Sequence, residues 1–185
     1  MELDEFCELF ADALAGADAK ALAHKAFQPG IGPFGEADAV RLALAHLQEL
    51  DPKRFGRAQI KRQPDLLIPE LWQIEFKLVR PFGDNGKQAE NWSQNVLHPY
   101  PGNTSSLGDC IKLMASEGSE RKAVVVFGYE HTECQISLEP CIRGFEILAD
   151  KLLGIQLSSR QSVIRKCLLH PVHQVLHVFG WELSA

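Results

Sequence analysis

The amino-acid sequence predicts an α/β domain, and the order of its expected helices and strands indicates a mixed β-sheet. Three observations lead to this fold class. Apolar residues recur at three- and four-residue spacing through the first fifty positions, which indicates amphipathic helices. Residues 71–79 alternate apolar and polar side chains, as in a strand with one buried face. Residues 122–128 are almost continuously apolar, which is typical of a central strand covered on both faces.

Length and composition favour one globular domain in a reducing compartment. The chain has 185 residues, of which 45% are hydrophobic and 23% charged, and this excludes disordered and collagen-like classes. Its acidic start is unlike a signal peptide, and its five cysteines form no CxxC pair, so we expect a cytoplasmic protein without membrane contact. We expect a single domain over 1–185, with a helical N-terminal extension at 1–30 and a core at 31–185.

The N-terminal fifty residues predict two helical stretches. The first begins with the apolar spacing of Phe6, Leu9, Phe10 and Leu14, and its alanine-rich continuation over 17–27 should end at Pro29-Gly30. A second helix should run from Glu36 to about Leu50. Its buried stripe is expected to contain Val40, Leu44 and Leu47, with Leu50 near the end.

A β-hairpin is predicted over 65–79. A short strand at 65–68 and the strand at 71–79 would be joined by the loop Pro69-Glu70-Leu71. This loop pairs Ile68 with Trp72 and sets Asp65 opposite Glu75, with the apolar residues of both strands on one face. Whether 57–63 adds another strand stays open.

The remaining elements follow the same patterns. Helices are predicted within 105–116 and from Glu139 to Leu153, where Gly154 would end the second one. The segment Val175–Glu182 should be an edge strand.

One polar pattern on the hairpin suggests chemistry. The chain has four Asp/Glu-x-Lys triplets, but only Glu75-Phe-Lys77 lies in a predicted strand, with both charges on one face and Asp65 on the neighbouring strand. Two carboxylates this close repel each other unless a cation lies between them, and oxygen-liganded Mg²⁺ is the usual partner. A lysine beside the ion can position water or stabilise charge that develops on phosphorus. The alternative is a cross-strand ion pair on an exposed sheet face.

These residues resemble the PD-(D/E)xK, or restriction-endonuclease-like, nucleases. Pro64-Asp65 and, after nine intervening residues, Glu75-Phe-Lys77 match the family motif. The resemblance implies that Asp65 and Glu75 bind the metal and that Lys77 supports the attacking water. It also implies a glutamate on the preceding helix, for which Glu36 is the candidate ligand and Glu49 competes. Gln88, followed by Trp92, is similar to a glutamine–aromatic motif of some members.

The same resemblance implies a restriction-endonuclease-like core, a mixed β-sheet flanked by helices, with an extra N-terminal helical segment. The implied activity is hydrolysis of phosphodiester bonds in nucleic acid, with DNA favoured, Mg²⁺ as cofactor and Mn²⁺ as a substitute. A homodimer that cuts two strands is compatible with it. The competing hypothesis is a nuclease-fold protein that binds nucleic acid or acts as an adaptor without cutting.

The charge distribution bears on both hypotheses. Although the net charge is −5, residues 52–87 carry eight Lys/Arg against four Asp/Glu. Cations that precede Asp65 or follow Lys77 could line a phosphate-binding rim, or they could form a solvated face. The candidates are Arg54, Arg57, Lys61, Arg62, Arg80 and Lys87.

A third hypothesis concerns zinc. Cys167, His170, His173 and His177 are residue types that bind zinc, but their spacing fits no standard closed site. Histidines at a sheet edge are the favoured interpretation.

Overall fold

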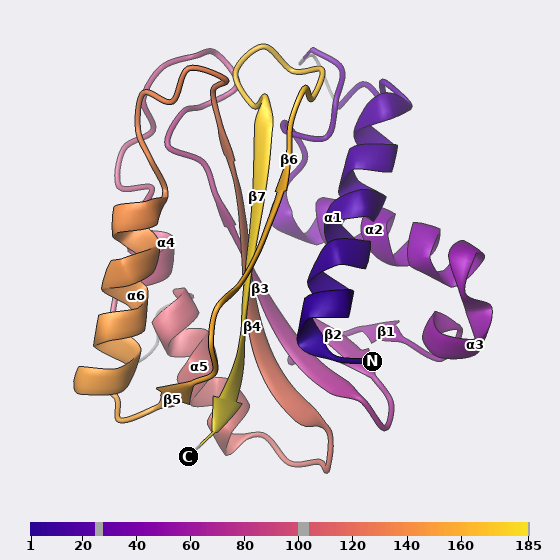
Figure 1. Ribbon diagram of the computed structural model, residues 1–185, viewed down its shortest axis with the longest axis vertical. Helices are drawn as coiled ribbons and strands as arrows, with labels where there is room; N and C mark the ends of the chain where they lie inside the picture. The colour runs from indigo at the N-terminus through magenta and orange to yellow at the C-terminus, as the bar shows by residue number, and fades with distance from the viewer. Residues whose placement is uncertain (25–27, 100–103, 185) are drawn as a thin grey trace.

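The computed structural model describes residues 1–24, 28–99 and 104–184. In this part of the chain, seven strands form one open, mixed sheet in the order β1-β2-β3-β4-β7-β5, with β6 also paired to β7. The β3–β4 pair is parallel and the other pairs are antiparallel. Helices α1, α2 and α3 lie on one side of the sheet, and α4, α5 and α6 lie on the other (Figure 1). The predicted α/β class and mixed sheet are therefore confirmed.

Two hydrophobic clusters, one on each side of the sheet, hold the layers together. On the first side, Phe10 of α1 (Leu3–Ala19) lies 4.9 Å from the ring of Phe76 and 5.5 Å from that of Phe127, measured between ring centroids. On the second side, Phe145 of α6 (Glu139–Lys151) lies 5.0 Å from Trp181. The helix predicted as an N-terminal extension thus supplies part of the main core.

The N-terminal helices agree with the prediction except at the end of α1. Helix α1 stops at Ala19, and residues 20–24 are not helical, because Ala21 has a positive φ of 51° and Asp18 accepts hydrogen bonds from Ile31 N and Leu169 N. The helical continuation predicted over 17–27 is confirmed for 17–19 and wrong for 20–24, and 25–27 lie outside the described residues.

Helix α2 (Glu36–Leu50) has the predicted bounds, and a short helix α3 (Pro52–Phe55) follows it. Val40, Leu44 and Leu47 are buried as expected, but Leu50 is 62% exposed. At about 100° per residue, Leu50 lies roughly 80° around the helix from Val40, beside the buried stripe. No helix in the described residues is long and apolar enough to cross a bilayer.

The hairpin is confirmed in its predicted register. β2 (Leu66–Ile68) and β3 (Trp72–Val79) pair with Ile68 opposite Trp72 and Leu66 opposite Ile74. The open question about 57–63 is answered by β1 (Gln59–Ile60), which pairs with β2. All eight residues of β3 are buried, so its polar face is not the exposed face that alternation suggested. Helix α5 (Ser106–Ala115) packs against that strand and covers it.

The C-terminal half completes the sheet. β4 (Arg121–Glu130) lies between β3 and β7 (Val175–Ser184), which confirms a central strand at 122–128. The prediction that 175–182 is an edge strand is wrong. β7 pairs with β4 along one side, and with β5 (Gln156–Leu157) and β6 (Gln161–Arg165) along the other. These short strands protect an edge that the sequence pattern left open. The short helix α4 (Gln94–Leu97) follows β3.

Candidate active site

The candidate site lies where β3 extends beyond β2. β2 is three residues long and β3 is eight, so backbone N–H groups in the second half of β3 lack a strand partner on that side. Two carboxylates replace the missing strand: Asp65 Oδ2 accepts from Phe76 N at 2.8 Å, and Glu36 Oε2 accepts from Leu78 N at 2.6 Å. Asp65 is held at the start of the hairpin and Glu36 at the first turn of α2. Distant segments are thereby fixed beside Glu75 and Lys77.

Lys77 is the cation around which the acidic groups gather. Its Nζ lies 3.0 Å from Asp109 Oδ2 and 3.8 Å from Glu36 Oε1. Burial lowers the pKa of Lys77, but the carboxylates of Glu36 and Asp109 outweigh that effect, so the pKa lies above its usual value. The Lys77 ammonium therefore stays charged although only 9% of the residue is exposed.

Asp109 belongs to α5, the helix that covers the polar face of β3. It is buried, and its Oδ1 also accepts a hydrogen bond from Lys112 Nζ at 2.7 Å. One aspartate thus links Lys77 in the sheet to Lys112 on the helix. An isolated charge at this depth would cost several kcal/mol, so Asp109 and Lys77 stabilise each other's charged state.

Glu75 has no such cationic partner in contact. Its Oε1 is buried and accepts no hydrogen bond from the described residues. Burial, together with the nearby carboxylates of Asp65 and Asp109, raises the pKa of Glu75 to about 9. The raised pKa favours the protonated form of the Glu75 carboxyl at neutral pH.

These groups line one cleft of about 350 Å³. Its walls bring together acidic, basic and neutral polar side chains from four separate segments: Glu36, Arg62, Gln63, Asp65, Glu75, Lys77, Thr104, Asp109 and Lys112. In the described residues, no group of three or more His, Cys, Asp or Glu side chains is arranged to hold a metal ion. Asp65 and Glu75 nevertheless form a carboxylate pair with one unsatisfied oxygen. Such a pair suits a hard cation that keeps several waters.

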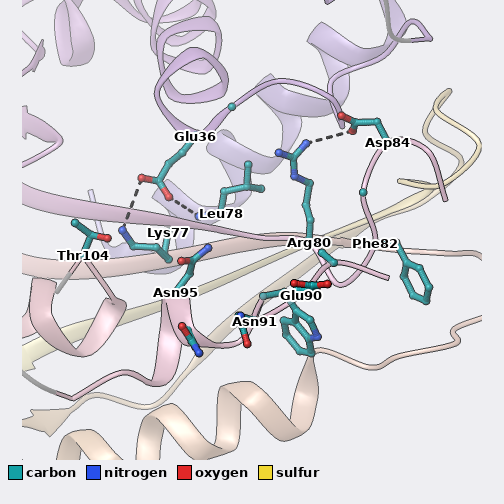
Figure 2. A pocket seen from close by; sticks show the side chains of 15 residues that line it. Glu36, Lys77, Leu78, Arg80, Phe82, Asp84, Glu90, Asn91, Asn95 and Thr104 are labelled. Atoms are coloured by element: carbon teal, nitrogen blue, oxygen red, sulfur yellow. Dashed lines mark hydrogen bonds and ion pairs between the residues drawn. The ribbon is translucent and has the colours of Figure 1, made fainter. Parts of the chain in front are cut away.

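A larger pocket of about 620 Å³ adjoins this cleft and shares Glu36, Lys77 and Thr104 with it. Figure 2 shows Glu36 between Lys77 and Leu78, with Arg80 and Asp84 paired further along the wall and Asn91 and Asn95 on the opposite side. The cleft and the pocket are thus neighbours that share part of their walls.

The structure brings together four of the five predicted site residues. Glu36, Asp65, Glu75 and Lys77 line the same cleft. Gln88 does not: it is exposed, pairs with Phe82 in an isolated bridge before α4, and lines a different depression. The glutamine–aromatic motif places its glutamine on a helix, but Gln88 does not lie on one. Glu49, the competitor of Glu36, is exposed near the other end of α2.

Only some of the predicted cations line the cleft or the pocket. Arg62 lines the cleft and makes no hydrogen bond or ion pair within the described residues, and Arg80 lines the adjoining pocket but pairs with Asp84 at 3.3 Å. Arg54 and Arg57 instead pair with Glu5 and Glu70.

Asp109 and Lys112 were missed by the sequence reasoning. The available signal was an acid on the predicted buried face of helix 105–116, at helical spacing from Ser106 and Leu113.

The four residues of the zinc hypothesis do not gather at one point. His170 and His173 are buried and stack at 4.7 Å between centroids, and His173 Nε2 lies 3.0 Å from Asp84 Oδ1. His177, on β7, lies 3.3 Å from Glu130 instead. Cys167 is exposed. Within the described chain these side chains form no metal-holding group.

Comparisons of the chain with protein-family models, with curated proteins and with solved structures gave no match.

The raised pKa of Glu75 predicts a stability that depends on pH. Between the ordinary value of 4.5 and about 9, the native state binds one proton more than the unfolded chain at this site. The free energy of unfolding of the metal-free protein should therefore fall as pH rises through this window. Urea unfolding at several pH values should show this fall in the wild type and a flatter profile in Glu75→Gln. An unchanged profile in the variant would show that Glu75 titrates normally.

The Lys77–Asp109 pair predicts strong energetic coupling. Asp109→Ala leaves Lys77 buried without its nearest carboxylate and should lower the free energy of unfolding by about 3–5 kcal/mol. Adding Lys77→Met should recover part of the lost free energy of unfolding, because the unpaired charge is then removed. The control is Asp38→Ala, which breaks an exposed pair with Arg41 and should cost at most about 1 kcal/mol. Additive losses in the double variant would contradict the pairing.

Proposed function

We propose that this protein is a metal-dependent nuclease that hydrolyses phosphodiester bonds in nucleic acid, with DNA as the favoured substrate. The observation that carries the proposal is the convergence of Asp65, Glu75 and Lys77 in one cleft. Their sequence spacing resembles the PD-(D/E)xK motif, and the hairpin register brings them together as that motif requires. A restriction-endonuclease-like core is part of the proposal. The mixed sheet with helices on both sides is compatible with it.

Asp65 and Glu75 would hold the divalent cation. The fit rests on the buried, unsatisfied Oε1 of Glu75 and on the proximity of the two carboxyl groups, whose mutual repulsion a cation would relieve. When bound, Mg²⁺ or Mn²⁺ supplies Lewis-acid chemistry and lowers the pKa of a water molecule. Glu36, the third predicted ligand, has one oxygen on Leu78 N and the other toward Lys77, so its contacts support a positioning role in the metal-free protein.

Lys77 would act on the reacting phosphate and the attacking water. Glu36 and Asp109 keep its ammonium charged and fix it in the cleft wall, so little reorganisation is needed when negative charge develops. Arg62 and Lys112 add positive charge at the same cleft and can contact phosphate oxygens that flank the scissile bond.

A second candidate, nucleic-acid binding or an adaptor role without cleavage, is favoured by one specific observation. In the metal-free protein the raised pKa of Glu75 favours its protonated form at neutral pH, and Lys77 is engaged by two carboxylates. If deprotonating Glu75 costs more free energy than cation binding contributes, the cation does not bind. The cleft then binds phosphate without cutting it.

Cleavage by site variants tests the nuclease proposal. Asp65→Ala and Lys77→Ala should each lower the cleavage rate of DNA in Mg²⁺ or Mn²⁺ by a factor of about 100 or more, because each removes a group that acts on the reacting centre. The assay is single-turnover cleavage of labelled single- and double-stranded DNA. Lys53→Ala, an exposed lysine outside the cleft, is the matched control and should keep the wild-type rate.

The adaptor candidate would take the place of the nuclease if the wild type binds DNA but cleaves no faster than Asp65→Ala. Equal rates in wild type and both variants would assign any observed cleavage to a contaminant.

A further inference from the structure

The pocket beside the cleft has a lining unlike that of a phosphate channel. It contains two aromatic rings, Phe82 and Trp92, and the side-chain amides of Asn91, Gln94 and Asn95. Within the described part of the chain, none of these three amides makes a side-chain hydrogen bond. Its volume of about 620 Å³ is within the range of small-molecule sites. Free amides beside aromatic rings are the groups that recognise a polar heteroaromatic ring.

The charges of the pocket disfavour phosphate there. Arg80, the cation that lines this pocket but not the cleft, is bound to Asp84 and to the carbonyl of Gly32. Glu90 is exposed at the pocket and has no cationic partner among the described residues. An unpaired carboxylate repels phosphate but accepts hydrogen bonds from the amino groups of bases.

Of the two aromatic side chains, Trp92 is the one held by core packing, so it can serve as a rigid platform. Trp92 is half-buried and packs against the core cluster on the α6 side of the sheet. The ring of Phe82 makes an edge-on contact with His131, at 4.7 Å between centroids. Stacking on a fixed ring costs little side-chain entropy, and every nucleobase has a face that can stack.

From these observations we propose that the pocket binds an unpaired nucleobase of the strand whose phosphate lies in the adjoining cleft. The inference deepens the proposed function and rests on it. It assigns the substrate class as single-stranded or locally unpaired nucleic acid. Since a base paired within a duplex presents its faces to its neighbours, it enters such a pocket only when unstacked.

A strand without bases provides the direct test. Fluorescein-labelled single-stranded DNA of mixed sequence is compared with a strand of equal length made only of abasic deoxyribose phosphates. Binding is followed by anisotropy with Ca²⁺ in place of Mg²⁺, and gels verify that the strands stay intact. The wild type should bind the normal strand about tenfold more tightly than the abasic strand.

Variants assign that preference to the pocket. Gln94→Ala combined with Asn95→Ala removes two of the three amides of the pocket, both exposed on α4, and should weaken the preference for the normal strand while leaving abasic binding unchanged. The control is Gln135→Ala, which changes an exposed amide residue outside the pocket and should keep the wild-type preference for the normal strand. Trp72 and Trp181 are fully buried, so quenching of the half-exposed Trp92 by the normal strand alone should report stacking.

Three results would overturn the proposal: equal affinity for both strands, an unchanged preference in the double variant, or no binding of either strand. Cleavage of the same normal strand in Mg²⁺ or Mn²⁺ is measured in parallel. Base-dependent binding without cleavage would refute the nuclease function alone. Cleavage without base dependence would refute the pocket alone.

Discussion

The candidate site depends on one backbone constraint, the unequal lengths of β2 and β3. Because β2 ends early, the N–H groups of Phe76 and Leu78 need acceptors from outside the sheet, and buried N–H groups without partners are costly. The carboxylates of Asp65 and Glu36 supply them. The same hydrogen bonds that complete the sheet edge therefore place two acids from distant segments at a cleft that also contains Glu75 and Lys77.

Helix α5 both buries these charged side chains and neutralises one of them. By covering the polar face of β3 it desolvates Glu75 and Lys77, and it also provides Asp109 as a counterion for Lys77. Glu75 receives no equivalent cation, and its raised pKa is the consequence. We propose that a divalent cation bound by Asp65 and Glu75 favours the ionised form of Glu75.

Local patterns predicted the hairpin, its register and the main helices, since alternation and helical spacing depend on nearest neighbours. They could not show that β7 lies inside the sheet, because β5 and β6 are too short to produce a periodic signal. Asp109 was missed for a related reason: its role follows from the docking of α5 on β3, a tertiary contact. Gln88 was chosen by motif alone, and the chain between β3 and α4 places it outside the cleft.

The central claim is that Asp65 and Glu75 jointly bind a divalent cation, and calorimetric titration of Mn²⁺ at pH 7 tests it most directly. We expect one site in the wild type, with release of about one proton as Glu75 ionises, measured in buffers of different ionisation enthalpy. The site should be lost in Asp65→Ala and in Glu75→Gln, and kept in Glu49→Ala. Binding that survives both cleft variants, or an absence of binding in the wild type even with DNA present, would contradict the account.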